Sequence, residues 1–287
     1  MQDVACGLIM AGYPVILDKV NLIPEHQRMH LPDMPSYAWN HRSRYLLEPR
    51  TAADHRHPKF PSHELLGLLV PGCNPLQPTF RNVLRAEDVS WLADHQLQSE
   101  TVLPAAGYVS MAIEALHFVN RAAGIDKLLA GYKLRKVDIT SALVVPALSS
   151  GVEIIFSLRP CSESELDHEN WYEFELFSVE NSTWVRHCRG YVGAEKKMTS
   201  KTGLKMSTSP PKADNFLPTD EEPNPVTAET IFSTLRNMEF YHGPCFQNLA
   251  DSQVTKSKSI TQFHIASNIQ GSRTRYILHP TTLDSIF

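Results

Sequence analysis

The sequence of 287 residues predicts an α+β fold in which one long helix is wrapped by a curved antiparallel sheet. The first observation is an apolar helix pattern that follows Pro104, and the second is a series of four strand-like runs that comes directly after it. The composition agrees, because 42% hydrophobic residues are normal for a globular chain. Periodicity alone would equally admit other α+β folds.

Residues 1–62 predict a connector, because they contain several prolines and little sustained periodicity. From His63 the pattern becomes globular, and the stretch from Phe80 to Val89 has the apolar and β-branched content of a strand. Pro104 suits the start of a helix, where its missing N–H costs nothing, and Gly124 suits its end. Between them apolar residues recur at three- and four-residue intervals: Val109, Ala112, Ile113, Leu116 and Val119.

The strand-like runs occupy residues 132–145, 151–160, 171–180 and 183–194. In the third run Phe174 and Leu176 alternate with Glu173 and Glu175, which is typical of a strand with one buried face. This order suits a sheet that wraps the preceding helix.

Residues 197–225 predict a linker, because they are rich in Lys, Ser, Thr, Pro and acids and poor in large apolar groups. Beyond it, Val226, Ile231, Leu235 and Met238 predict a short amphipathic helix, and residues 260–265 predict a strand.

Charge and composition exclude several classes of protein. A net charge of −4 with scattered Lys and Arg gives no reason to expect nucleic-acid binding. No apolar stretch approaches the ~20 residues of a membrane helix, and the N-terminus lacks the basic flank of a secretion signal. The sequence therefore predicts a cytoplasmic protein with neither nucleic-acid nor membrane partners.

No metal site is expected from the sequence. The five cysteines are widely spaced and form no CxxC pair, so they indicate neither disulfides nor zinc. His55, His57 and His63 lie in a proline-rich connection without cysteine or carboxylate partners at ligand spacing. The neighbouring residues His187 and Cys188 do not predict a catalytic dyad, because neighbours in a strand point to opposite faces.

Three ordered segments carry a family resemblance. His95 opens a run that ends at Pro104, residues 241–247 read YHGPCFQ, and residues 279–284 read HPTTLD. They resemble the HxxxGxxxxP, YGPxFQ and HPxxLD segments of dehydratase domains in polyketide synthases and animal-type fatty acid synthases, with Ser99 in place of the glycine. Residues 31–45 resemble the linker that follows the acyltransferase domain in fungal polyketide synthases, with Leu46 in place of the usual tryptophan.

The resemblance is to the dehydratase region of a fungal highly reducing type I polyketide synthase, preceded by the post-acyltransferase linker. It implies a double hotdog, in which a long central helix is wrapped by a curved antiparallel sheet twice. On this layout residues 1–62 form the linker, residues 63–196 the N-terminal hotdog, residues 197–225 the connection between the hotdogs, and residues 226–287 a partial C-terminal hotdog. The chain is then expected to be a piece of a longer synthase, with its second hotdog truncated.

By resemblance the activity is removal of water from a 3-hydroxyacyl chain to give a 2,3-enoyl thioester. Such an elimination needs one base and one acid, and the resemblance assigns His95 as the base and Asp284 as the acid. A neutral imidazole suits the first role. A carboxyl suits the second when burial keeps it protonated. Because both must reach one three-carbon fragment, we expect their polar ends within roughly 4–8 Å.

The resemblance also implies substrate contacts at Ser99, Pro104, Tyr241, Gly243 and Pro244. The helix that follows Pro104 would offer free backbone N–H groups to the thioester oxygen. Tyr241 would line the pocket wall, with its hydroxyl near the acid.

No metal or nicotinamide is implied, since the substrate is carried on the phosphopantetheine of an acyl carrier protein. The partners would be that carrier protein and the neighbouring synthase domains. The oligomeric state stays open, with a homodimer inside a larger synthase as one arrangement.

Two other functions remain open at this point. A product-template domain of a non-reducing synthase also uses a His and Asp pair, to guide aldol cyclisation, and a non-catalytic module would only dock neighbouring domains. The short helix at Pro280 adds a further expectation, because two turns lie below the ~12–15 residues needed for marginal helicity in water. We therefore expect residues 270–287 to be weakly protected, with Asp284 too solvated for its pKa to rise far and little dehydratase activity in this chain.

Overall fold

The computed structural model describes residues 2–22, 35–36, 38–40, 42, 47–58, 60–147, 151–161, 171–180, 182–197, 224–255, 259–263, 272 and 274–286. The chain divides into two compact units, residues 1–47 and residues 48–287. Most of the linker-like segment at residues 31–45, and residues 198–223 of the predicted connection, lie outside the described residues.

Among the described residues of the first unit are the helices α1 (Gln2–Met10) and α2 (Leu17–Val20). A third helix, α3 (Arg50–Arg56), belongs to the second unit, where Arg50 donates to the carbonyl of Gly72 at 2.9 Å. Asp54 of the same helix accepts from the N–H of Gly72 at 3.2 Å. These contacts tie residues that we expected in the connector to the globular part of the chain.

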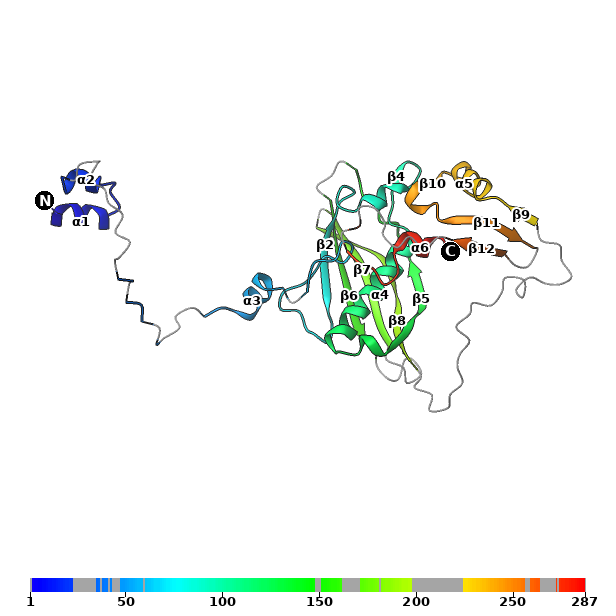
Figure 1. Ribbon diagram of the computed structural model, residues 1–287, viewed down its shortest axis with the longest axis horizontal. Helices are drawn as coiled ribbons and strands as arrows, with labels where there is room; N and C mark the ends of the chain where they lie inside the picture. The colour runs from blue at the N-terminus through cyan, green and yellow to red at the C-terminus, as the bar shows by residue number, and fades with distance from the viewer. Residues whose placement is uncertain are drawn as a thin grey trace. The chain divides into compact units, whose positions relative to one another are not determined.

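The main sheet of the second unit wraps one helix, α4 (Ala105–Ala122), as Figure 1 shows. Its six strands are antiparallel, and α4 packs against β5, β7 and β8 and, through Phe118 on Phe80, against β2. This arrangement confirms the predicted helix wrapped by a sheet. The strand order is β1 (Leu68–Leu69), β2 (Thr79–Leu84), β6 (Val152–Pro160), β7 (Trp171–Glu180), β8 (Thr183–Lys196) and β5 (Leu129–Ile139).

Helix α4 is buried over most of its first three turns because its side chains there are small or apolar. Pro104 is its N-cap, one position before the start that we predicted, and Gly124 follows its end in the left-handed region with φ +72°. Among the core side chains, Phe156 and Phe174 stack with ring centroids 5.8 Å apart. The alternation predicted for β7 is confirmed, since Phe174 and Leu176 are fully buried.

A bulge between β7 and β8 changes the reason for rejecting a His187–Cys188 dyad. Both side chains are buried, because Leu176 pairs with Cys188 while Phe177 pairs with Arg186, which leaves His187 as the extra residue. Nε2 of His187 is 2.7 Å from the Ser178 hydroxyl, and burial raises the pKa of Cys188 to about 12. The thiol is therefore a packed and unreactive group.

The C-terminal part adds two small sheets and two helices over the N-terminal end of α4 (Figure 1). One sheet has the order β12–β11–β9 and the other β10–β3–β4. The second sheet joins the two halves of the chain, because β3 and β4 lie just before α4 while β10 lies far beyond it. The elements are β3 (His95–Leu97), β4 (Glu100–Thr101), β9 (Asn224–Val226), α5 (Ala228–Asn237), β10 (Phe240–His242), β11 (Leu249–Val254), β12 (Ser259–Phe263) and α6 (Pro280–Asp284). The described part of the chain also contains the short 3-10 helices η2 (Ser90–Asp94), η3 (Asp126–Leu128) and η5 (Pro244–Phe246).

Helix α6 is packed on α4, which corrects the expectation of a solvated chain end. Pro280, Thr281, Thr282 and Leu283 are buried. Leu283 packs on the α4 residues Ala106, Val109 and Ile113, and the Ser110 hydroxyl donates to the carbonyl of Leu278 at 2.9 Å. The face of α4 thus supplies the apolar partner that a helix of this length lacks in water.

Glu114 of α4 provides a testable source of pH-dependent stability. Its carboxylate accepts from the N–H of Ile277, and burial raises its pKa to about 7 from an ordinary value of 4.5. A raised carboxyl pKa means that the folded state holds the proton more tightly, so stability falls as pH rises from about 4.5 to about 7.

We expect Glu114→Gln to remove this fall, because the amide oxygen still accepts from Ile277 and carries no charge. The variant should gain about 1–3 kcal/mol over the wild type at pH 8 and nothing at pH 4. Urea unfolding at several pH values measures it. Equal slopes of stability against pH in the two proteins between pH 5 and pH 7 would show that Glu114 is not the source.

Candidate active site

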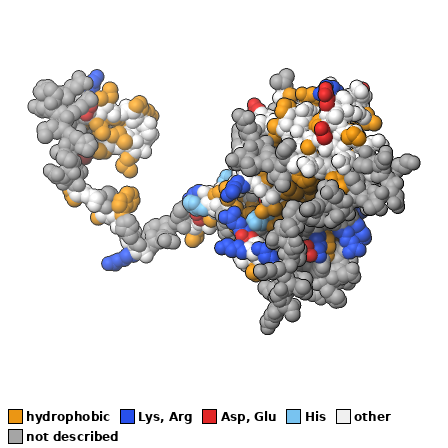
Figure 2. Space-filling view, turned by 45° about the vertical axis from the view of Figure 1, so that its right-hand side comes forward, with side chains coloured by type: hydrophobic (Ala, Val, Ile, Leu, Met, Phe, Trp, Pro, Cys, Tyr) orange, Lys and Arg blue, Asp and Glu red, His pale blue; other side chains and the backbone are white. Residues whose placement is uncertain are grey.

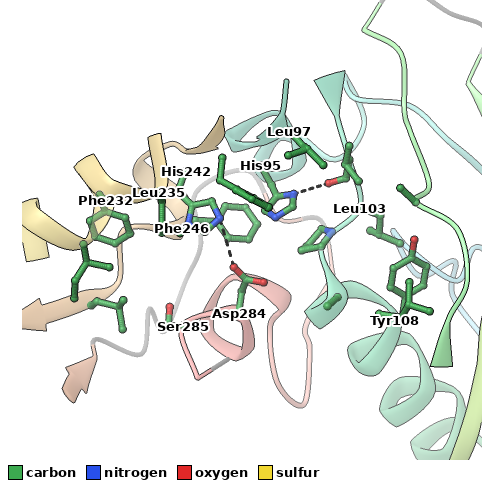
Figure 3. Close-up of a pocket in the computed structure, with 18 of the residues that line it drawn as sticks. His95, Leu97, Leu103, Tyr108, Phe232, Leu235, His242, Phe246, Asp284 and Ser285 are labelled. Atoms are coloured by element: carbon green, nitrogen blue, oxygen red, sulfur yellow. Dashed lines mark hydrogen bonds and ion pairs between the residues drawn. The ribbon is translucent and has the colours of Figure 1, made fainter. Parts of the chain in front are cut away.

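A cavity of about 670 Å³ lies where β3, β10, α5, α6 and the first turn of α4 meet (Figure 3). Its walls are mainly apolar, and they include Leu97, Leu103 and Tyr108 on one side and Phe232 and Leu235 of α5 on the other. Two imidazoles and one carboxyl group face into it, those of His95, His242 and Asp284. An apolar hollow with a few converging polar groups is the usual form of a ligand site.

His95 lies at the start of β3, with its ring held by one hydrogen bond. Nδ1 is 2.7 Å from the carbonyl oxygen of Val102. Because a carbonyl can only accept, Nδ1 carries the proton and the neutral ring keeps its lone pair on Nε2. The structure thus gives His95 the tautomer that a base needs.

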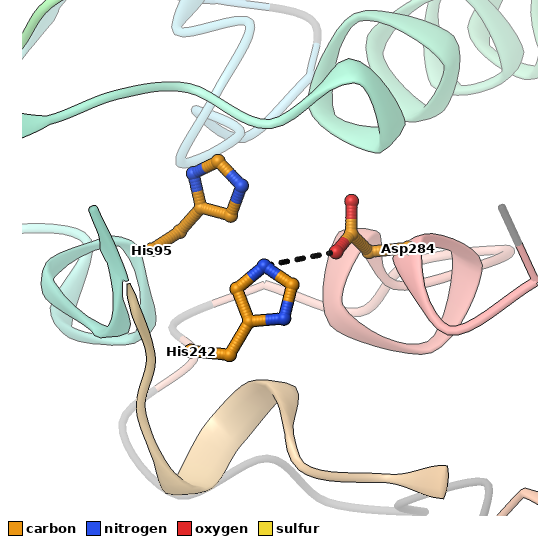
Figure 4. A group of neighbouring side chains, drawn as sticks. All are labelled: His95, His242 and Asp284. Carbon is orange, nitrogen blue, oxygen red and sulfur yellow. Dashed lines mark ion pairs between the residues drawn. The ribbon is translucent and has the colours of Figure 1, made fainter. Parts of the chain in front are cut away.

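Asp284 is the last residue of α6, and only 15% of its side chain is exposed. Burial raises its pKa, and the nearby His95 opposes that shift in part. This corrects the expected solvated carboxyl. A ring nitrogen of His95, a ring nitrogen of His242 and a carboxylate oxygen of Asp284 all lie within 4.8 Å of one another. Figure 4 shows the three side chains. The expected proximity of His95 and Asp284 is therefore present, although the two residues are far apart in the sequence.

His242 is the site residue that the sequence analysis missed. Strand β10 pairs with β3 so that His242 lies directly opposite His95, with ring centroids 5.3 Å apart. Its Nε2 is 3.9 Å from Oδ2 of Asp284, which is ion-pair distance. Burial and, secondly, His95 lower the pKa of His242 to about 4, so the ring is neutral at pH 7 and the contact is not a salt bridge there.

A signal for His242 was present in the sequence. When YHGPCFQ is aligned on its Gly-Pro pair, the residue directly before Gly243 is His242, in the place of the tyrosine of YGPxFQ. Tyr241 is one position too early. The histidine therefore occupies the position that we had assigned to an aromatic hydroxyl.

Tyr241 and Ser99 lie away from the cavity, which corrects two expected substrate contacts. Successive residues of β10 point to opposite faces, so Tyr241 is 41% exposed while His242 points inward. Tyr241 and Ser99 line a separate hollow with Gln96 and Arg236. Neither residue is among the described residues that line the cavity with His95 and Asp284.

Ser99 serves the turn between β3 and β4. Gln98 and Ser99 have φ of 50° and 67°, the left-handed region that glycine adopts without cost. A two-residue hairpin loop with positive φ at both positions is the tight turn in which glycine is preferred. The position of the glycine in HxxxGxxxxP thus requires a left-handed backbone here, and Ser99 adopts it with strain.

We expect Ser99→Gly to stabilise the chain by about 1 kcal/mol, because it relieves left-handed strain without touching the cavity. Ser99→Ala is the matched control, since it removes the same hydroxyl but keeps a Cβ. Thermal unfolding of both variants gives the answer. A gain in Ser99→Ala equal to that in Ser99→Gly would mean that the hydroxyl, and not the backbone, is responsible.

Gly243 and Pro244 follow directly after His242, the last residue of β10. Neither is among the described residues that line the cavity. A Cβ on Gly243 would lie 2.5 Å from Cγ of Asp94. The N–H of Gly243 donates to the Asp94 carbonyl at 2.7 Å, and the N–H of Cys245 donates to Oδ2 of Asp94 at 2.8 Å. Asp94 precedes His95, so these bonds fix the two histidine strands to each other.

Two further residues of the recognised segments position the site. Pro104 lines the cavity and offers no side-chain acceptor to the first turn of α4. His279 caps α6 by accepting from the N–H of Thr281 at 3.2 Å, and its ring packs on Trp91 and Tyr276. His279 thereby sets the start of the short helix that ends in Asp284.

Two family models match the chain in sequence. One, described as "Polyketide synthase dehydratase domain", covers residues 63–179, and the other, described as "Polyketide synthase dehydratase N-terminal domain", covers residues 212–287. Together they contain His95, His242 and Asp284. The chain belongs to the polyketide synthase dehydratase family. The two matched ranges contain all three motif segments, at residues 95–104, 241–247 and 279–284.

Curated relatives match this dehydratase region along the whole chain. The highly reducing polyketide synthase pks5 of Leptosphaeria maculans is 46% identical and covers 100% of the chain, and azaB of Aspergillus niger is 39% identical with the same coverage. The chain spans 11% of the length of each of these relatives. The match therefore shows the family of the region.

Solved dehydratase domains share its fold. The dehydratase domain from the CurF module of the curacin synthase has a TM-score of 0.62 at 21% identity, and covers 78% of this chain and 74% of its own. A trans-AT dehydratase domain from Brevibacillus brevis has a TM-score of 0.61 at 17% identity, over 78% of this chain and 71% of its own. The α+β architecture is thus that of the polyketide synthase dehydratases.

Two further observations concern membrane-spanning helices and the distribution of basic side chains. Among the residues that the structure describes, no helix combines the length and apolar character needed to cross a bilayer. On the face shown in Figure 2, described Lys and Arg side chains occur in separate small groups.

Proposed function

We propose that this region removes water from a 3-hydroxyacyl thioester, with His95 as the base and Asp284 as the acid. The observation that carries the proposal is that both side chains face one mainly apolar cavity. The Nδ1 of His95 is hydrogen-bonded to Val102, which leaves the lone pair on Nε2 available to accept a proton. An elimination needs this pair of opposite proton roles within reach of one substrate.

The reaction follows from the two proton positions. Nε2 of His95 takes a proton from C2 of the acyl chain, and the electron pair forms the C2–C3 double bond as the C3–oxygen bond breaks. The Asp284 carboxyl gives its proton to the departing hydroxyl, which leaves as water. Transfer of the proton from His95 to Asp284 then restores both groups for the next substrate.

The first turn of α4 is suited to the thioester carbonyl. Leu103, Pro104 and Ala105 line the cavity at the point where the helix presents backbone N–H groups and the positive end of its dipole. Negative charge grows on the thioester oxygen as the C2 proton leaves. Fixed N–H donors at this position stabilise that charge.

The wall formed by α5 is suited to the acyl chain. Ile231, Phe232 and Leu235 present apolar surface to the cavity beside His242. An alkyl chain gains free energy there in proportion to the apolar area removed from water. A 3-hydroxyacyl chain carried on the phosphopantetheine of an acyl carrier protein combines this tail with a thioester. That carrier, the neighbouring synthase domains and a cytoplasmic location stay predictions.

Two solved structures with this fold agree with a need for one histidine and one aspartate. A His-to-Phe and an Asp-to-Asn variant of the CurK dehydratase are each described as an inactive mutant. We propose that His95 and Asp284 are the equivalent residues of this chain. The family match favours dehydration over the product-template cyclisation that the sequence left open.

One incubation tests the proposal. The chain is mixed with a 3-hydroxyacyl pantetheine thioester and, separately, with a poly-β-keto thioester, and products are followed by mass spectrometry. Because α6 is packed on α4 and Asp284 is buried, we replace the expectation of little activity and expect a 2,3-enoyl product from the first and no cyclised product from the second. Cyclisation without dehydration would support the product-template alternative, and no turnover of either would support the docking alternative.

A further inference from the structure

We propose that His95, His242 and Asp284 form a chelating site for one divalent transition-metal ion of the Zn²⁺ class, and that the metal competes with the thioester substrate. The claim of competition rests on the proposed dehydratase function, whereas the claim of binding does not. The site exists because His242 stands beside the base and acid, on a strand paired with that of His95.

The three side chains converge from three elements, as Figure 4 shows. One ring nitrogen of each histidine and one carboxylate oxygen all lie within 4.8 Å of one another, and the pair His242 Nε2–Asp284 Oδ2 is at 3.9 Å. Tetrahedral Zn²⁺ with bonds of about 2.0–2.1 Å holds its ligand atoms roughly 3.3 Å apart. The ligand atoms therefore need to close by about 0.6 Å for the His242–Asp284 pair and by at most about 1.5 Å for the others, which rotation about side-chain bonds supplies.

The surroundings of the cluster suit a metal. The bond from Nδ1 of His95 to the Val102 carbonyl fixes the ring and leaves Nε2 to coordinate, an arrangement common around metal-bound histidines. His242 is held between Phe232 and Phe246, with ring centroids 6.3 Å and 5.7 Å away. Only 15% of each of the His242 and Asp284 side chains is exposed, so the ligands are already partly desolvated.

The ligand set selects the kind of ion. Two imidazoles and one carboxylate suit Zn²⁺, Co²⁺, Ni²⁺ or Cu²⁺, whereas Mg²⁺ and Ca²⁺ prefer oxygen ligands alone. Three protein ligands leave a coordination position open to water. An ion bound in this way occupies the His95 lone pair and the Asp284 oxygen, so the cavity cannot remove and donate protons while the metal is present.

Binding is measured first, with Co²⁺ as the probe in the full chain of 287 residues. We expect one equivalent of Co²⁺ to give the intense visible absorption of a tetrahedral site, and one equivalent of Zn²⁺ to abolish it. Because the chain has 13 histidines, His57→Gln on the exposed end of α3 is the matched control and should keep the absorption. Mg²⁺ should not displace the bound Co²⁺.

Two variants test the ligands independently. His242→Phe keeps an aromatic ring between Phe232 and Phe246, and Asp284→Asn keeps the shape of the carboxyl. Each should weaken Co²⁺ binding by more than the ~10–100-fold that loss of an outer-shell partner typically costs. Circular dichroism verifies that each variant is folded, and two variants keep the test valid if one fails to fold. Absorption unchanged in both, or absent in the wild type, would overturn the proposal.

The competition is measured with the 3-hydroxyacyl pantetheine thioester. In chelator-treated buffer the chain should dehydrate it, and added Zn²⁺ should raise KM with little change in kcat. Co²⁺ binding without dehydration in metal-free buffer would contradict the proposed function and leave the metal site standing. Dehydration that is insensitive to Zn²⁺ at concentrations that saturate the Co²⁺ site would overturn the competition.

Discussion

His95→Ala should lower the dehydration rate of the chain by ~10²–10⁴-fold, the usual contribution of a general base. The lost imidazole is the group whose Nε2 lone pair faces the cavity. Its removal also takes away the Nδ1 bond to Val102, which contributes about 1 kcal/mol, and the ring contacts with His242 and Phe246. Single-turnover assays with the pantetheine thioester measure the rate. His57→Ala, on the exposed end of α3, is the matched control.

A folded His95→Ala variant is needed for this result to be interpreted. Because the variant keeps the β3–β10 pairing, its thermal unfolding should stay close to that of the wild type. Retention of more than half the wild-type rate would remove His95 from the role of base.

Asp284→Asn should give a loss of similar size, because the amide fills the same space but has no acidic proton to give to the departing hydroxyl. The packing of Leu283 on α4 should be unaffected, so the variant should unfold like the wild type. Asp126→Asn, in η3 beyond the far end of α4, is the matched control. A variant that forms enoyl product at the wild-type rate would exclude Asp284 as the acid.

Helix α4 and the sheet around it were predictable because their signals are local. The period of the apolar residues in α4 and the alternation in β7 each lie within one element, and both were confirmed. Local signals also fixed the approximate ends of α4, where Pro104 and Gly124 occur. Each of these residues acts through its own backbone preference, which a single sequence displays.

His242 was missed because its place depends on long-range pairing. Its neighbour in the site is His95, and only the register of β10 on β3 brings the two rings together. Short strands show no periodicity that could decide whether Tyr241 or His242 points inward, and a shift of one residue exchanges the two faces. The burial of Asp284 had the same cause, because the helix that packs on α6 lies far away in the sequence.

Other departures came from irregular backbone. The bulge opposite Leu176 turns His187 and Cys188 to the same buried side, against the simple alternation of a strand. The turn at Ser99 places that residue outside the cavity, although its motif position suggested a substrate contact. In both cases one local change in φ or in register overrides the residue pattern.

The central claim is that His95 and Asp284 act as one acid–base unit in one cavity, and the double variant His95→Ala/Asp284→Asn tests it most directly. Groups that serve the same reaction step are strongly non-additive in their effects. Single-turnover rates of the wild type, both single variants and the double variant are compared on the same 3-hydroxyacyl pantetheine thioester. The account predicts a double variant about as slow as the slower single variant. A double variant slowed by the full product of the two single effects would show that the residues act independently and would contradict it.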